Sequence, residues 1–522
     1  MLSIVCCLTT MDRDTEHPET LQENISPTES SRENISPTES SPENTSDSSP
    51  DKSSPEKSVS GHSIREAFVD PLSEKDVLTP QQAKKLRFST SLGVGLQIQA
   101  ICASHIICRD VISSGSVGIQ QWLEPRRYEW SITCLYFPYA VLPIVSVFLF
   151  KRSNPRVFLG AEMFLWGLNC LLFAFVHNYG GMIVARLFLG LLLNFGVPSM
   201  LYVVYEHHGR FNGQFVLACA WGVSWFLVPC FAMIAIALGL IHDGKAGWQW
   251  MFIVTGTAGC LQSALVYLTL PDYFYSSRWI RKHGLAAYEY FKEYSEADYC
   301  GGNPVEPAET LVEGLVSTLK DPLVWGCGVL GLFTMYGIGS SYSQLMSYTL
   351  SSLHFSPAEG QLVIWPVMFT SMVWCLLQAW FSGKLRVNYV FLLSNYIFAI
   401  VGWAMTLGRV SDHNLWVKYG GAWFVLPNMV ASFVTTACWL GSNVQGRNRR
   451  LMSFTVFAMI VNWYGVLEFR TFVHNEIPLF HRSIWIDMGF MIGACFLSTA
   501  LFLWLRWRNM NGGGWNGFMY VL

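Results

Sequence analysis

Long apolar segments alternate with short polar ones between about residues 88 and 507. Twelve windows, treated as uncharged, each run for about 20 residues, which matches the hydrocarbon thickness of a bilayer at about 1.5 Å per helical residue. They are 88–108, 128–150, 157–176, 180–205, 215–241, 248–270, 323–350, 361–382, 389–408, 419–441, 451–472 and 484–507. Because an unpaired backbone amide in lipid costs several kcal/mol, each window is predicted to be a helix. The pattern predicts an all-α polytopic membrane protein with twelve transmembrane helices.

The windows fall into two groups of six on either side of a polar stretch that contains RWIRKHG and GGNPVEPAE. A basic turn, KRSNPR, joins the second and third windows, and another, GKLRVN, joins the eighth and ninth. A turn that recurs at the same ordinal position is typical of parallel repeats, although any inner loop attracts Lys and Arg. The predicted parts are a tail (1–85), two six-helix halves (86–270 and 323–507), a central cytosolic loop (271–322) and a C-terminal cytosolic tail (508–522).

The N-terminal tail differs in composition from the rest of the chain. Residues 1–85 hold 16 of the 36 acidic but only 8 of the 34 basic residues, and ENISPTESS at 23–31 recurs at 33–41. Segments this rich in Ser, Pro and Glu bury too little apolar surface to offset chain entropy, so residues 12–80 are predicted to be disordered. The tail is either a plain spacer or, through Ser-Pro pairs such as Ser26-Pro27, a phosphorylated switch.

Loop charge predicts the orientation. With a cytosolic N-terminus, the short inner loops carry 9 Lys and Arg in 25 residues, whereas the outer loops carry 7 in 55. This bias favours both termini inside. The stretch GKAGWQWMF at 244–252 then becomes an outer turn, with Trp248 and Trp250 at the depth of the lipid headgroups.

The composition disfavours several other classes of protein. Charged residues make up 13% of the chain, about half the soluble norm of roughly 25%. The fourteen cysteines lie mostly inside apolar windows without a CxxC pair, and no Walker A stretch suggests an ATP-driven pump. The nearest approach to an enzyme or metal motif is His207-His208, whose rings would point about 100° apart on a helix. No metal, cofactor or catalytic residue is expected.

Five motifs, taken in order, resemble the anion:cation symporter branch of the major facilitator superfamily, which includes fungal allantoate, nicotinate and pantothenate permeases. They are GKAGWQWMFIVTG, LPDYFYSSRWI, KDPLVW, HFSPAEGQLVIWP and WLGSNVQGRNRRLMSF, and the match covers about 88–507. The resemblance implies the major facilitator fold. It also implies a secondary active transporter that moves a small organic anion by alternating access between the two halves.

The same resemblance implies which residues bind the substrate. Arg186 matches an arginine that holds the organic anion, and Tyr139 and Asn462 match positions that line the cavity. The Glu that follows this arginine by seven residues in the family is Leu193 here, and the Asp-Arg pair of the first helix is reversed and shifted to Arg109-Asp110. Transport is therefore expected to depend less on protons than in relatives that keep the Glu.

Each assignment has a competing structural explanation. Arg186 could instead bond carbonyl groups of a neighbouring helix, and Arg109 and Asp110 could form a gate pair, supply a coupling carboxylate or lie in a solvated outer loop. Glu468 and Arg470 stand about 200° apart on a helix and are predicted to face different ways, with both able to reach headgroup water.

Two further functions share the fold, an exporter of a metabolite and a transporter-like nutrient sensor. The expected partners are the lipid bilayer, a small organic anion and, as a coupling ion, the proton, with no nucleic acid. A monomer in the plasma membrane is expected, with the vacuolar or another internal membrane as the alternative.

Overall fold

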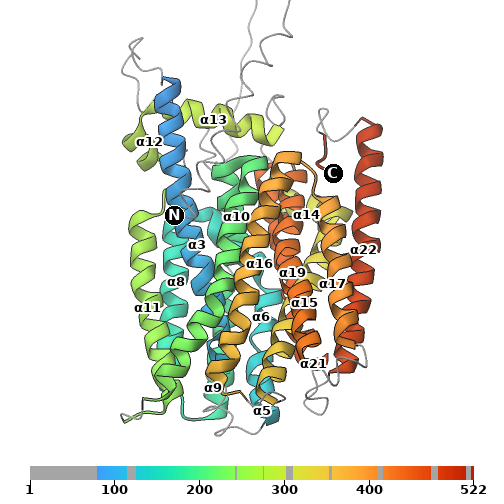
Figure 1. Ribbon diagram of the computed structural model, residues 1–522. Helices are drawn as coiled ribbons and strands as arrows, with labels where there is room; N and C mark the ends of the chain where they lie inside the picture. Colours follow the sequence, from blue (N-terminus) through green and yellow to red (C-terminus); the bar gives the residue numbers. More distant parts are fainter. Residues whose placement is uncertain are drawn as a thin grey trace, which may run out of the picture.

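The computed structural model describes residues 79–114, 125–194, 196–241, 244–273, 276–300, 310–351, 355–407, 415–471, 480–512 and 519–522. All but the last residues of the predicted tail 1–85 lie outside this part. The described residues are almost entirely helical, and the helices form two halves that lie side by side (Figure 1).

The N-terminal half runs from the first described helix to residue 269. Its helices are α3 (Pro80–Ser114), α5 (Pro125–Thr133), α6 (Tyr136–Val141), α7 (Pro143–Arg152), α8 (Pro155–Phe173), α9 (Tyr179–Leu193), α10 (Gly196–Gly239) and α11 (Gly247–Thr269). The C-terminal half contains α15 (Pro322–Ser351), α16 (Pro357–Leu385), α17 (Tyr389–Leu407), α19 (Leu415–Asn443), α20 (Arg447–Val461), α21 (Tyr464–Thr471) and α22 (His481–Met510).

The predicted spans are confirmed as helices. Among the described residues, eleven helices are long and apolar enough to cross a membrane, and one bent pair would make a twelfth. The bent pair is the second predicted span, which turns by 56° at Pro143 because proline has no N–H to continue the helical ladder. The helix α10 contains the second part of the span Tyr179–Arg210 and the whole span Asn212–Gly239. They meet near Gly209 at φ 71°, a conformation that glycine adopts without strain.

The segment predicted to be the central loop contains three short helices, α12 (Ser277–His283), α13 (Leu285–Cys300) and α14 (Leu311–Leu319). The last begins at a capping box in which Thr310 and Glu313 bond each other's backbone N–H groups. Hydrogen bonds from Thr310 lower the pKa of the exposed Glu313 carboxyl. Polar composition alone did not predict these helices.

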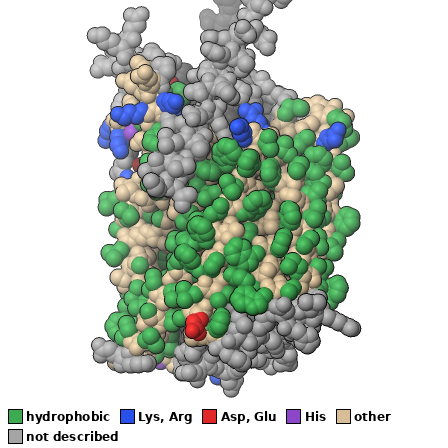
Figure 2. Space-filling model, viewed as in Figure 1, with side chains coloured by type: hydrophobic (Ala, Val, Ile, Leu, Met, Phe, Trp, Pro, Cys, Tyr) green, Lys and Arg blue, Asp and Glu red, His purple; other side chains and the backbone are tan. Residues whose placement is uncertain are grey.

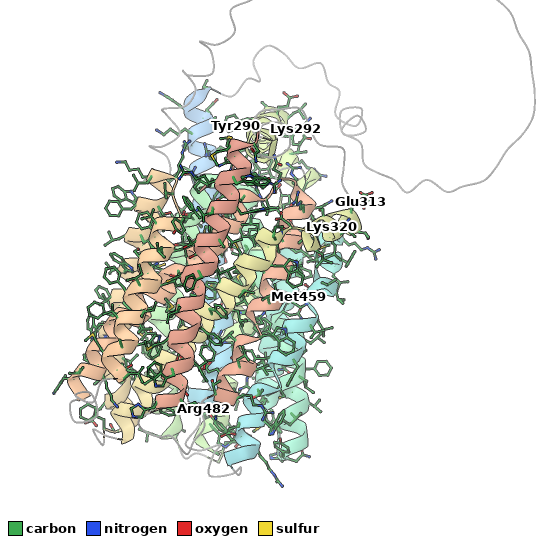
Figure 3. All side chains as sticks on the ribbon, turned by 90° about the vertical axis from the view of Figure 1, so that its right-hand side faces the viewer. Tyr290, Lys292, Glu313, Lys320, Met459 and Arg482 are labelled. Atoms are coloured by element: carbon green, nitrogen blue, oxygen red, sulfur yellow. The ribbon has the colours of Figure 1, made fainter. Side chains whose placement is uncertain are left out.

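The three short helices lie at one end of the bundle, at the top of Figure 1. We call this the inner end, because the predicted orientation places it in the cytosol, and the opposite end the outer end. In Figure 2, Lys and Arg side chains gather at the inner end above a band of hydrophobic side chains, as the charge bias of the loops predicts. Figure 3 places Lys292, Glu313 and Lys320 at the inner end and Arg482 at the outer end.

Small residues set how closely the helices pack within each half. A Cβ at Gly256 of α11 would lie 2.7 Å from the carbonyl oxygen of Gly167 in α8, and a Cβ at Gly402 of α17 would lie 2.7 Å from that of Gly421 in α19. Helices in a membrane gain little from the hydrophobic effect, so close backbone approach of this kind stabilises their association. These contacts fix the rotation of each helix and therefore which side chains reach the interface between the halves.

Candidate functional site

Arg109 of α3 is a cation buried at the interface between the halves. Its side chain is only 7% exposed. The guanidinium carbon lies 5.7 Å from the ring centre of Trp225, in the N-terminal half, and 5.9 Å from that of Tyr464, in the C-terminal half. The alternative of a solvated outer loop is therefore wrong for Arg109. The side chain of Asp110 lies outside the described part of the chain, so no gate pair with Arg109 can be assigned.

Tyr139 and Asn462 meet at the same interface. The side-chain amide of Asn462 donates to the backbone carbonyl of Tyr139 at 3.3 Å, and both residues are buried. Beside them, the hydroxyl oxygens of Tyr136 and Tyr464 lie 3.3 Å apart, with ring centres at 5.4 Å. Three of the five predicted site residues thus lie where the two halves touch.

Arg186 of α9 points elsewhere. It is 1% exposed, its Nη1 donates to the Arg109 carbonyl at 3.3 Å, and its guanidinium carbon lies 5.6 Å from the ring centre of Phe173 in α8. All these contacts are inside the N-terminal half, and the bond to a carbonyl has the geometry of the structural alternative. Its Nε and Nη2 have no hydrogen-bond partner among the described residues, so the guanidinium is only partly satisfied.

Glu468 and Arg470 face different ways, as predicted. Arg470 is exposed and lies 4.7 Å from the ring centre of Trp130, which suits a position at the headgroups. Glu468 is 7% exposed and accepts a hydrogen bond from the Ser343 hydroxyl at 3.1 Å. The expectation that both residues reach headgroup water is therefore wrong for Glu468, because its helix turns it toward α15.

Two buried carboxylates were missed because they lie inside windows treated as uncharged. Glu162 of α8 is 4% exposed, and Asp487 of α22 is fully buried. Asp487 accepts a hydrogen bond from the Ser340 hydroxyl at 2.8 Å. A single acidic residue changes the mean hydropathy of a 20-residue window very little. Its rarity at membrane depth is the signal that could have identified it.

The outer end of the interface is closed by aromatic side chains. The Tyr136 and Tyr464 rings pack edge to face, as do Phe137 and Trp463, with ring centres 6.2 Å apart. A Cβ at Gly465 would collide with the Tyr136 ring, so only glycine permits this approach. We call these five residues the outer closure.

Charged and backbone groups close the inner end. Glu206 of α10, whose side chain is fully buried, pairs with Arg447 of α20 at 3.4 Å. Arg210 of α10 donates to the Ser442 carbonyl, and the Ser442 hydroxyl donates to the Arg210 carbonyl at 3.0 Å. We call these four residues the inner closure. Contacts across the interface are thus present at both ends, and we call this arrangement the occluded state.

The segment 519–522 is attached to the inner closure. The Val521 N–H donates to Asn443 Oδ1 at 2.6 Å, and the Asn443 amide and the Trp439 indole N–H both donate to the Val521 carbonyl at 2.9 Å. Arg210, from the other half, donates to the Met519 carbonyl. The segment therefore bridges the two halves beside the Arg210–Ser442 contact.

The histidine pair has backbone roles. Nδ1 of His207 lies 3.0 Å from the Val203 carbonyl and Nδ1 of His208 lies 3.0 Å from the Val204 carbonyl, with both rings buried. No group of three His, Cys, Asp or Glu side chains suited to a metal ion occurs in the described part of the chain.

Comparisons with known proteins agree with this architecture. The profile of the Major Facilitator Superfamily matches residues 112–467. An uncharacterized transporter of Schizosaccharomyces pombe is 23% identical over 83% of this chain and 86% of its own length. The high-affinity nicotinic acid transporter of Saccharomyces cerevisiae is 23% identical over 74% of this chain and 70% of its own length.

A solved structure shows the same fold. The proton:xylose symporter XylE, bound to 6-bromo-6-deoxy-D-glucose, superposes with a TM-score of 0.63 at 13% identity, over 80% of this chain and 95% of that chain. With two helical halves, an interface closed at both ends and a family profile that matches more than half of its residues, the chain belongs to the Major Facilitator Superfamily.

Proposed function

We propose that this protein is a secondary active transporter that moves a small organic anion by alternating access, in the manner of the anion:cation symporters. The observation that carries the proposal is the position of Arg109, a buried cation between one aromatic ring from each half. A permanently charged side chain at membrane depth costs at least about 2.5–3.5 kcal/mol on insertion scales, so it normally faces a substrate path or a partner. A carboxylate carries a negative charge and can accept two parallel hydrogen bonds from a guanidinium.

The neighbouring residues fit this role. Tyr139 and Asn462 contact each other beside Arg109 and belong to opposite halves, so a substrate held there would touch both moving parts. The Trp225 and Tyr464 rings hold the Arg109 guanidinium in place through cation–π contacts. The similarity to a nicotinic acid transporter supports an anionic substrate of that class. Arg186 becomes a positioning residue, because its bond to the Arg109 carbonyl fixes the backbone from which Arg109 extends.

The test is uptake into proteoliposomes that contain the purified full-length chain. Competition among labelled nicotinate, allantoate and pantothenate first identifies the best substrate of the wild type. The apparent affinity for that substrate is then measured in three variants. Arg109→Lys keeps the charge but loses the planar fork, so the apparent affinity should fall at least tenfold. Arg186→Lys should lower it less, and the exposed control Arg470→Lys should leave it unchanged.

The outcomes separate the competing functions. Binding of the substrate without transport would favour a nutrient sensor. Transport of the substrate only from the cytosolic face to the outer face would favour an exporter. Unchanged affinity in Arg109→Lys, with an intact wild-type response, would remove Arg109 from the substrate site and with it the main support for an anionic substrate.

A further inference from the structure

A carboxylate is buried near the middle of the N-terminal half. Glu162 lies on α8, and its Oε1 is 2.9 Å from the point that a Cβ would occupy at Gly196. His105 Cδ2 of α3 is 3.3 Å from the same point, so the two side chains meet over this glycine. Gly196 is near the centre of the span Tyr179–Arg210. The pair is thus close to the midplane of the predicted membrane region.

The carboxyl group is only partly satisfied. Glu162 Oε2 has no hydrogen-bond partner among the described residues, and none of their Lys or Arg side chains pairs with it. The opposite face of α8 carries Gly160 and Gly167, which pack on α11. Glu162 therefore points away from α11 and into the N-terminal half.

The titratable groups around Glu162 come from three other helices. On α3 these are His105 and, one turn farther out, Arg109. On α6, Tyr139 lies within electrostatic range of both Arg109 and Glu162. On α9, Arg186 is directed to the Arg109 carbonyl and Phe173. The segment of α10 that faces Glu162 offers Gly196 and Met200, neither of which titrates.

His105 is held in a defined orientation. Its Nε2 lies 2.9 Å from the carbonyl oxygen of Leu193, and since a carbonyl only accepts, Nε2 carries a hydrogen. The ring centre is 5.8 Å from that of Tyr139. His105 thus connects Glu162 to the residues at the interface between the halves.

Burial decides which form of Glu162 the occluded state holds. An unpaired carboxylate in a low-dielectric interior costs several kcal/mol, whereas a neutral carboxyl group carries no charge to desolvate. A proton on Glu162 therefore stabilises the closed structure. Opening of either closure admits water, which stabilises the ionised form and allows the proton to leave.

We propose that Glu162, with His105 beside it, is a proton-binding site that loads and unloads as the halves rock. The inference rests on the proposed function, because it makes the proton the ion that moves together with the anion. One proton passes from external water to Glu162 in the outward-open state, remains there through occlusion and leaves to internal water. This proposal differs from the expectation of weaker proton dependence, which was based on Leu193 and on the reversed Arg109-Asp110 pair.

The first test uses labelled nicotinate and proteoliposomes with a pH difference of one unit. If one proton accompanies each monovalent anion, accumulation should reach about tenfold, because one pH unit corresponds to about 1.4 kcal/mol. Glu162→Gln keeps the shape of the side chain but cannot release a proton. In this variant the ratio of internal to external nicotinate should fall to about one, while some exchange of nicotinate across the vesicle membrane continues. The matched control is Asp487→Asn, a buried carboxylate of the other half, and it should accumulate as the wild type does. Tenfold accumulation in Glu162→Gln would overturn the proposal.

The second test needs no substrate. Infrared difference spectra between pH 9 and pH 6 detect the stretching band of a protonated carboxyl group directly. They are recorded for the single variant Asp487→Asn and for the double variant that also carries Glu162→Gln. A carboxyl band that disappears with Glu162→Gln supports the site, and identical spectra overturn it. If nicotinate and the other anions are not transported but the band is present, the proposed function fails while the proton site stands.

Discussion

The two ends of the interface between the halves are closed by different chemistry. The outer closure consists of aromatic rings packed against a glycine. The inner closure consists of an ion pair with one buried partner and two bonds to backbone carbonyls, and the segment 519–522 is attached to it. Aromatic packing depends on shape and tolerates salt, while an ion pair depends on both partners being present. The two closures should therefore fail in response to different substitutions.

The first prediction tests whether each closure faces the predicted side of the membrane. The result is all or none, because an introduced cysteine is either labelled from outside or not labelled. A cysteine at Lys245, at the outer end, should react with an impermeant thiol reagent in intact cells, and a cysteine at Asn448, beside the inner closure, should not. Labelling is read against that of the native cysteines. Reversed labelling would exchange the inner and outer assignments.

The largest energetic effect is expected at Gly465 in the outer closure. Gly465→Val inserts a side chain into the space of the Tyr136 ring, and overpacking of this kind costs about 1–3 kcal/mol. The occluded population should fall up to about 100-fold in favour of the outward-open state. Spin labels at Lys245 and Trp416 would report the opening as a longer distance. Gly489→Val, at an exposed glycine with open space around it, should leave the distance unchanged.

The next effect concerns the ion pair of the inner closure. Arg447→Met leaves the buried Glu206 without this partner, and because Arg447 is 37% exposed we expect about 2 kcal/mol, less than the about 3–5 kcal/mol of a fully buried pair. Spin labels at Lys84 and Lys320 should move apart as the inner end opens. The control is Arg449→Met, which breaks the Arg449–Asp321 pair inside the C-terminal half.

A second variant tests whether charge is the cause. Adding Glu206→Gln to Arg447→Met removes the buried negative charge and should restore much of the closed population. An unchanged distance in the double variant would show that the aliphatic part of Arg447, rather than its charge, holds the inner end.

The smallest effect is expected from the attached segment. Asn443→Ala removes two hydrogen bonds to Val521, each worth about 0.5–1.5 kcal/mol. At the lower end of this range, about 1 kcal/mol in total, the inner end should open about fivefold more often. Asn428→Ala, on the same helix but bonded to the Phe424 carbonyl, is the matched control. If the two variants behave alike, the segment contributes nothing to closure.

The sequence by itself determined the order of the membrane-spanning helices, because hydropathy depends only on the composition of each segment. The resemblance to a known family added Arg109, Tyr139, Arg186 and Asn462 as candidate site residues. The sequence did not predict the helices of the segment 271–322, because these helices are too short to form an apolar window.

Only the tertiary structure decided where each polar side chain points. Close approach at Gly167 and Gly256 sets the rotation of α8 and places Glu162 over Gly196, while the packing of α9 turns Arg186 into its own half. Likewise, the two closures join residues more than 200 positions apart, such as Glu206 with Arg447. Composition cannot encode such pairings, because they arise from the relative placement of whole helices.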